Sequence, residues 1–356
     1  MWESPTRHVS LGKKLPTDRA VTTSRMSKSS FIGALAAFGT IAIVTTACGS
    51  SEPRSGFQDD QIPADPSGLG NGTTGPIGGK PAGENPSADE CQKMDIIFVV
   101  DDSGSMKEEQ TNLASNFPNF VKVLEGFKTK SGSKLDYRLA VTTTGRDISY
   151  TIEAPGFPVA LPPQSEKGDN GAFRNNCGSP KRWVDKADGN VAGTFSCLAK
   201  TGTSGPSIEM PLYALKLALN DRMNDGTNKG FLRDDALLAI VVLTDEDDCS
   251  REDDNFKIAN DVCSTMPNTK PVAEYAAMLD VAAKGPGRWA SAVIAGDKKC
   301  SSSFGDAAEA TRLKQFISIA GKNGTFSSIC DGDLTPALQK ALDTFDAACK
   351  NFPPVR

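Results

Sequence analysis

Histidine is almost absent from this sequence of 356 residues, since the only one, His8, lies in a basic leader. The rest of the chain therefore has no Ser-His-Asp triad, no Cys-His dyad and no zinc site with a histidine ligand. C-x-x-C pairs are absent as well, which argues against a metal cluster held by cysteines. These absences exclude several large classes of enzyme and metalloprotein.

Acidic residues outnumber basic residues outside the leader. The first 47 residues hold six Lys and Arg against two Asp and Glu, whereas the whole chain has a formal net charge of -5 at pH 7. The remainder is therefore acidic, and acidic surfaces repel the phosphates of nucleic acids. We expect no nucleic-acid partner.

One apolar run stands near the start of the chain. It covers residues 31–47, follows a basic start at Met26 and ends in Ala47 and Cys48. A basic start, a short apolar run and a small residue before the cut are typical of a secretory signal and not of a spanning helix.

The end of this run resembles a bacterial lipobox, although Thr45 stands where that motif usually has an aliphatic residue. The resemblance implies a lipid on Cys48, which becomes the first residue of the mature protein. Gly49 after it resembles an outer-membrane address. The expected location is thus the bacterial outer membrane or cell surface, with the lipid as the only membrane contact. Secretion without a lipid, a periplasmic location and an uncleaved anchor are the alternatives.

The segment after Cys48 is unusually poor in large apolar side chains. Residues 49–90 contain nine glycines and six prolines, so burial cannot offset the entropy of ordering them. We divide the chain into a leader and signal peptide over 1–47, a disordered tether over 48–90, a folded domain over 91–350 and a tail over 351–356.

Eight cysteines lie in the folded domain. An even number downstream of an export signal indicates disulfides rather than free thiols, although four bridges allow 105 connectivities. In an α/β domain the start of the first strand and the end of the last helix can meet, which favours Cys91 with Cys349. The others are expected to pair locally, as Cys177–Cys197, Cys249–Cys263 and Cys300–Cys330, with cross-pairing among the last four cysteines as the alternative.

Buried strands and amphipathic helices alternate along the domain. Residues 94–100, 237–243 and 290–295 are apolar on both faces, which is typical of parallel strands covered by helices. Residues 208–223 and 338–349 have apolar side chains at helical spacing. The expected fold is α/β, a doubly wound, mostly parallel sheet with helices on both faces. Residues 145–200 lack such a period and are expected to be an inserted loop.

Hydroxyl and carboxylate side chains follow the predicted strands. Asp101, Ser103 and Ser105 follow the first, Asp245 follows the central one, and Thr203 precedes a predicted helix. Ligands in such folds lie beyond the carboxyl ends of the strands. Hard oxygen donors suit Mg²⁺, Mn²⁺ or Ca²⁺, so we expect a divalent cation there, Mg²⁺ first.

Asp-x-Ser-x-Ser, an isolated threonine and Thr-Asp in this order resemble the metal-ion-dependent adhesion site of von Willebrand factor type A (VWA) domains. The resemblance covers residues 91–350. It implies that Ser103 and Ser105 bind the ion directly, that Asp101 and Asp245 supply carboxylates, and that Thr203 is a switchable ligand. The open position of the ion would accept an Asp or Glu of a protein or peptide partner, which is binding and not catalysis.

Two other interpretations stay open. The domain could be structural, with a vestigial site. It could also be a Mg²⁺-dependent phosphatase-like hydrolase, but Ser103 then occupies the place of the acid-base aspartate, and the reaction would lack its proton donor.

Overall fold

The computed structural model describes residues 91–129, 132–153, 162–259, 263, 266–302 and 305–354. The predicted leader, Cys48 and the tether lie outside these residues. No helix among the described residues is long and apolar enough to span a membrane.

Six strands form the central sheet, in the order β11-β8-β6-β1-β2-β5. Every neighbouring pair is parallel except β2 and β5. The strands are β1 (Lys93–Val100), β2 (Asp136–Thr143), β5 (Val184–Asp185), β6 (Ala236–Leu243), β8 (Trp289–Ala295) and β11 (Gly324–Ser328). All eight residues of β6 and all seven of β8 are buried, as expected for strands with helices on both faces.

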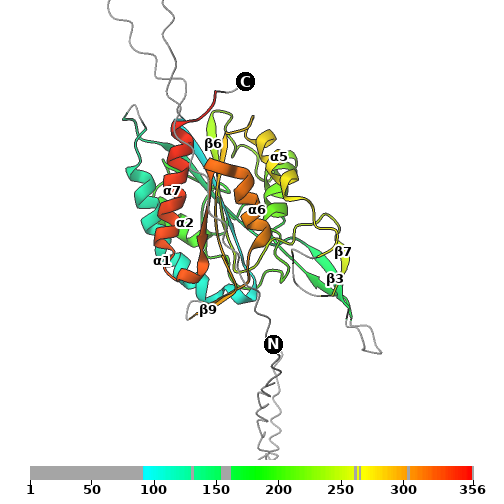
Figure 1. Cartoon of the computed structure of the whole chain (residues 1–356). Helices are drawn as coiled ribbons and strands as arrows, with labels where there is room; N and C mark the ends of the chain where they lie inside the picture. The colour runs from blue at the N-terminus through cyan, green and yellow to red at the C-terminus, as the bar shows by residue number, and fades with distance from the viewer. Residues whose placement is uncertain are drawn as a thin grey trace, which may run out of the picture. The chain divides into compact units, whose positions relative to one another are not determined.

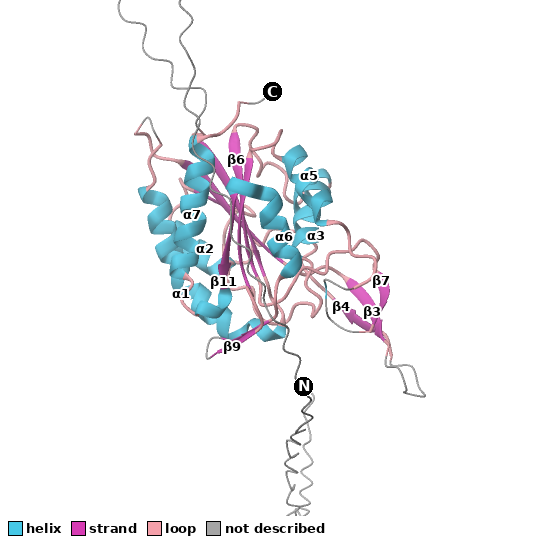
Figure 2. Ribbon diagram, viewed as in Figure 1, coloured by secondary structure: helices cyan, strands magenta, loops and turns pink. Residues whose placement is uncertain are grey.

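Helices cover both faces of this sheet (Figure 2). One face packs against α1 (Lys107–Gly126), α2 (Val191–Leu198) and α7 (Thr335–Lys350). Phe98 of β1 meets Phe117 and Phe195 there edge to face, with ring centroids 5.5 and 4.8 Å away. The other face packs against α3 (Pro211–Lys216), α5 (Val272–Ala282) and α6 (Thr311–Ala320). The doubly wound, mostly parallel α/β fold is confirmed.

The remaining elements are short. A single 3-10 turn, η1 (Gly104–Met106), precedes α1. A π-helical turn, η2 (Leu217–Asp221), and α4 (Arg222–Asn224) continue α3. Two 3-10 turns, η4 (Gly321–Asn323) and η5 (Ile329–Asp331), flank β11, and a hairpin joins β9 (Cys300–Ser302) to β10 (Gly305–Ala307).

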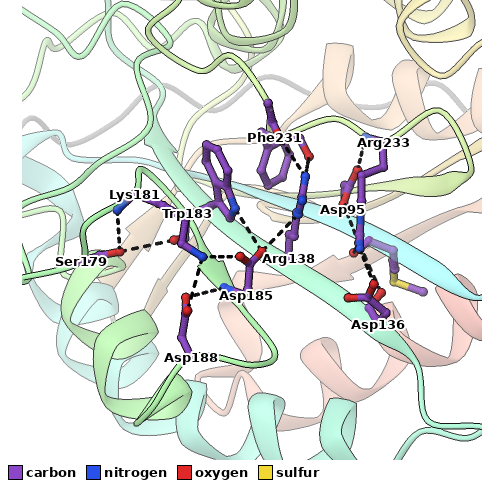
Figure 3. Close-up of polar contacts among 12 residues, drawn as sticks. Asp95, Asp136, Arg138, Ser179, Lys181, Trp183, Asp185, Asp188, Phe231 and Arg233 are labelled. Atoms are coloured by element: carbon purple, nitrogen blue, oxygen red, sulfur yellow. Dashed lines mark hydrogen bonds and ion pairs between the residues drawn. The ribbon is translucent and has the colours of Figure 1, made fainter.

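A second sheet of three strands, in the order β4-β3-β7, lies beside the first (Figure 1). Its strands are β3 (Ile148–Ile152), β4 (Gln164–Glu166) and β7 (Asn255–Ile258). Two of them belong to residues 145–200, which also supply β5 and α2. This region is therefore more than an inserted loop, because it completes the central sheet and one layer of the core. Arg138 of β2 holds the short β5 by an ion pair with Asp185, with N–O 3.1 Å (Figure 3).

Four disulfides staple the domain, and they are the four pairs expected from the sequence: Cys91–Cys349, Cys177–Cys197, Cys249–Cys263 and Cys300–Cys330. The first joins the start of β1 to the end of α7, where the backbone N–H of Cys91 also donates to the carbonyl of Cys349 at 3.1 Å.

Candidate metal centre

The carboxyl ends of β1, β2 and β6 lie at one level. Val100 of β1 is in register with Thr143 of β2 and with Leu243 of β6. The residues that follow, Asp101 and Thr244, are therefore neighbours at the same edge of the sheet, and the Asp101 N–H donates to the carbonyl of Leu243 at 2.9 Å.

Asp101 is a fully buried carboxylate, with 0% of its surface exposed. Its Oδ1 accepts the Ser103 N–H at 2.8 Å, and its Oδ2 accepts the hydroxyl of Thr244 at 2.6 Å. Burial raises the pKa of Asp101 to about 6, although these two hydrogen bonds lower it. No lysine or arginine pairs with it among the described residues, so the chain shown supplies no cation for this charge.

The two serines and Asp245 adjoin Asp101. Ser103 and Ser105 have their hydroxyl oxygens 2.9 Å apart, and Ser105 is near enough to Asp245 to lower the pKa of its carboxyl group. Asp245 is 1% exposed, and its Oδ1 has no hydrogen-bond partner. Burial, and then the nearby Asp101, raise the pKa of Asp245 to about 8. Four of the five predicted ligands are thus brought together.

Thr203 is the exception. Its loop does approach the first motif: the N–H of Gly205 donates to the carbonyl of Asp102 at 2.7 Å, and the hydroxyl of Thr201 donates to the carbonyl of Asp101 at 3.5 Å. Thr203 itself is half-buried, and none of the contacts described for this part of the chain joins it to the other four predicted ligands.

Glu209 is the functional candidate that the sequence interpretation missed. It lies just before α3, is 0% exposed, and neither of its carboxylate oxygens accepts a hydrogen bond of good geometry in the described structure. Burial first, and then the Asp101 and Glu246 carboxylates, raise the pKa of Glu209 well above its usual value.

Two further buried carboxyl groups adjoin the site. Burial raises the pKa of Asp102 to about 7, assisted by Asp169 and Asp101. Burial likewise raises the pKa of Glu109 to about 7. The carboxyl end of the sheet therefore concentrates buried carboxyl groups, and burial favours the protonated form of each.

The acidic side chains that follow β6 have different partners. Asp245 faces the site, whereas Asp247 accepts the N–H groups of Arg312 and Leu313 at the start of α6, at 2.9 and 3.2 Å. Asp248 pairs with the Arg312 guanidinium at 2.9 Å. The carboxylates of Asp247 and Asp248 therefore already have partners within the protein.

The donor set fits a small, hard cation. The two serine hydroxyls form a hydrogen bond with the oxygens 2.9 Å apart. Two oxygen ligands at right angles on an ion with Mg–O bonds of about 2.1 Å would lie about 3 Å apart, so an ion could replace this hydrogen bond with little movement. The unpartnered Oδ1 of Asp245 is another available donor. No group of three or more His, Cys, Asp or Glu side chains has metal-binding spacing within the described ranges, so hydroxyls would have to complete the coordination.

Comparisons with known proteins were made at three levels. No family model matches the sequence, and no curated protein matches it. Among solved structures, proximal thread matrix protein 1 from the mussel byssus is 15% identical with a TM-score of 0.37, covering 72% of this chain and 49% of that one. The pilus adhesin SpaC from Lactobacillus rhamnosus GG is 10% identical with a TM-score of 0.38, covering 74% and 31%.

The manganese-loaded TRAP protein of Plasmodium vivax is 13% identical with a TM-score of 0.30, covering 70% and 74%. This chain therefore spans less than half the length of the first two structures. At such identities the similarity concerns the arrangement of helices and strands, and no residue role is transferred from it.

Proposed function

We propose that the domain binds a divalent cation through Asp101, Ser103, Ser105 and Asp245, and that this ion binds a protein partner. Mg²⁺ is the first candidate, with Mn²⁺ and Ca²⁺ as alternatives. Thr203, the switchable ligand of the VWA motif, would join only after a movement of its loop.

The observation that carries this proposal is the pair of buried aspartates Asp101 and Asp245. They have no basic partner among the residues that the structure describes, and two serine hydroxyls 2.9 Å apart adjoin them. A buried carboxylate is costly unless a proton, hydrogen bonds or a cation neutralises it. A bound ion would supply that charge and act as an electrophile for oxygen ligands. A carboxylate of an Asp or Glu on the partner could then complete its octahedron, as in the adhesion sites that the motifs resemble.

We also propose that the protein is exported and held to the cell envelope by a lipid on Cys48. Four disulfides in the domain support an oxidising compartment. The tether over 48–90 would then hold the binding domain away from the membrane. In this setting the protein is an adhesion or interaction module and not an enzyme.

Isothermal titration of the full chain with Mg²⁺ and Mn²⁺ tests the proposal. Asp245→Asn should weaken binding by at least about tenfold, because it removes a charged ligand. Ser103→Ala should weaken it less, because it removes one neutral oxygen. Ser179→Ala is the matched control and should bind like wild type, because the Ser179 hydroxyl donates to the carbonyl of Trp183, next to β5, at 3.4 Å.

Failure of the wild-type chain to bind either ion at millimolar concentration would favour a vestigial site. Hydrolysis of a phosphate ester that depends on Asp101 would instead favour the phosphatase-like alternative.

A further inference from the structure

A small cleft with two arginines is formed by the segment that joins β4 to β5. Its volume is about 180 Å³, and its polar lining consists of Arg174, Arg182, Asn175, Asn176 and Asp169. A water molecule takes about 30 Å³ in the liquid, so a carboxylate or phosphate group fits this volume. Two of the charged lining residues are basic and one is acidic, which makes the cleft locally positive in a chain with a net charge of -5.

Both guanidinium groups are held in place and keep N–H groups that the protein does not use. Nη1 of Arg174 donates to the Asp169 carboxylate at 3.2 Å, and Nη1 of Arg182 donates to the carbonyl of Phe173 at 2.6 Å. These are the only hydrogen bonds of the two guanidinium groups within the described residues, although a guanidinium has five N–H groups. Nη2 of Arg174 and both Nε and Nη2 of Arg182 are not fully buried. These donors are therefore accessible to an acceptor from outside the chain.

The backbone of the cleft is fixed to the rest of the domain. The N–H of Arg174 donates to the carbonyl of Val141 in β2 at 2.8 Å, and the N–H of Phe173 donates to the Asn228 side chain at 3.0 Å. The Cys177–Cys197 disulfide then ties the following residues to α2. Donors that are already in position lose less conformational entropy on binding than donors on a mobile loop. The cleft is thus preorganised.

We propose that this cleft binds an oxyanion through Arg174 and Arg182. The planar guanidinium matches the oxygens of a carboxylate or a phosphate and donates two parallel hydrogen bonds to them. The side-chain amides of Asn175 and Asn176 are further donors for the same group. The carboxylate of an Asp or Glu on a protein partner and a free phosphate ion share this chemistry, and both are candidate ligands.

The cleft adjoins the loops at the carboxyl ends of the strands. The N–H of Asn170, beside the cleft, donates to the carbonyl of Gly145, just after β2, at 3.2 Å. Gly145 packs so closely on Pro206 that a Cβ there would lie 2.5 Å from the proline Cδ. Pro206 follows Gly205, whose N–H donates to the carbonyl of Asp102 at 2.7 Å. An acidic partner could therefore place one carboxylate in the cleft and another on the ion; this last step rests on the proposed function, whereas anion binding by the cleft does not.

Protection from phenylglyoxal, which modifies accessible arginine side chains, tests the cleft in the full chain without metal, in EDTA. Inorganic phosphate and, separately, a hexaglutamate peptide should each slow the modification of Arg174 and Arg182, measured by peptide mass spectrometry. In calorimetric titrations Arg182→Gln should weaken phosphate binding by about tenfold, because it removes charge-assisted hydrogen bonds. Lys322→Gln removes the same charge beside β11, at the other edge of the central sheet, and should bind like wild type.

The outcomes separate this inference from the proposed function. Protection by both anions supports a cleft for partner carboxylates, and protection by phosphate alone assigns it to a free anion. Unchanged modification of both arginines with either anion overturns the inference, and this measurement on wild type decides even if Arg182→Gln does not fold. A chain that binds phosphate but not Mn²⁺ keeps the cleft and loses the proposed function. Added Mn²⁺ should tighten hexaglutamate binding to wild type but not to Asp245→Asn; an equal effect on both would overturn the two-point contact.

Discussion

Two buried aspartates lie at opposite ends of β1, and their carboxyl groups have different partners. Asp95 is 1% exposed, and the Arg233 side chain donates to its Oδ1 at 2.8 Å while the Arg233 N–H donates to its Oδ2 at 2.7 Å (Figure 3). Asp101, about 20 Å further along the strand, has only a backbone N–H and a threonine hydroxyl. Burial raises the pKa of each to about 6, for Asp95 in spite of Arg233.

The two ends of the sheet differ in whether the chain supplies a basic partner for the buried carboxyl groups. The amino end carries its own cation and the Cys91–Cys349 disulfide. The carboxyl end gathers Asp101, Asp245 and Glu209, none of which pairs with Lys or Arg in the described residues. At the amino end the chain itself supplies the positive charge, whereas at the carboxyl end a proton or an ion would have to supply it. This difference supports the site proposed above.

The largest expected effect comes from removing the internal cation. Arg233→Met should lower the free energy of unfolding by about 3–5 kcal/mol, because Asp95 is left buried without its partner. Asp95→Asn combined with Arg233→Met should recover much of that loss, since the double variant buries no charge. Urea unfolding measures both. A single variant as stable as wild type would show that Arg233 is not needed to neutralise Asp95.

A smaller decrease in the free energy of unfolding is expected when the pH is raised. Because the pKa of Asp95 is about 6 in the folded protein against 3.8 as the usual value, the folded state holds this proton more tightly than the unfolded state. The stability that comes from protonated Asp95 is therefore fully present below about pH 4. It is lost as the pH rises through 6, which lowers the free energy of unfolding by about 1–3 kcal/mol.

Asp95→Asn should remove this part of the pH dependence, measured by urea unfolding at several values between pH 4 and 7. Added Mg²⁺ should leave the difference between the two curves unchanged, because Asp95 lies far from the candidate metal centre. Parallel curves for the variant and wild type would contradict the assignment.

Apolar runs made the central strands predictable from the sequence. The apolar run 94–100 corresponds to strand Lys93–Val100, and the run 237–243 corresponds to strand Ala236–Leu243. The agreement is close because strands buried on both faces have an unbroken apolar pattern. Strand β5 could not be found in this way, since it has two residues and depends on the ion pair of Asp185 with Arg138.

Helix starts were predicted less well, and Glu209 was missed for that reason. Apolar spacing over 208–223 gives Glu209 the place of an exposed residue on a long helix. The helix begins only at Pro211, and proline in the first turn was the available signal that Glu209 precedes it.

The smallest change in stability should follow from Asp101→Asn. In the metal-free protein we expect the free energy of unfolding to change by less than about 1 kcal/mol, because the amide removes a buried charge but keeps one oxygen to accept the Ser103 N–H or the Thr244 hydroxyl. Asp95→Asn instead leaves Arg233 without its buried partner and should cost more.

The effect of Mn²⁺ on the melting temperature should distinguish the two ends of β1 most directly. Wild type and Asp95→Asn should both melt at a higher temperature when Mn²⁺ is added, since ligand binding to the folded state stabilises it. Asp101→Asn should lose this increase because the ion loses a charged ligand, although its metal-free stability is nearly that of wild type. An equal Mn²⁺-induced increase in all three proteins would place the ion away from Asp101, and the difference between the ends of β1 would then have another cause.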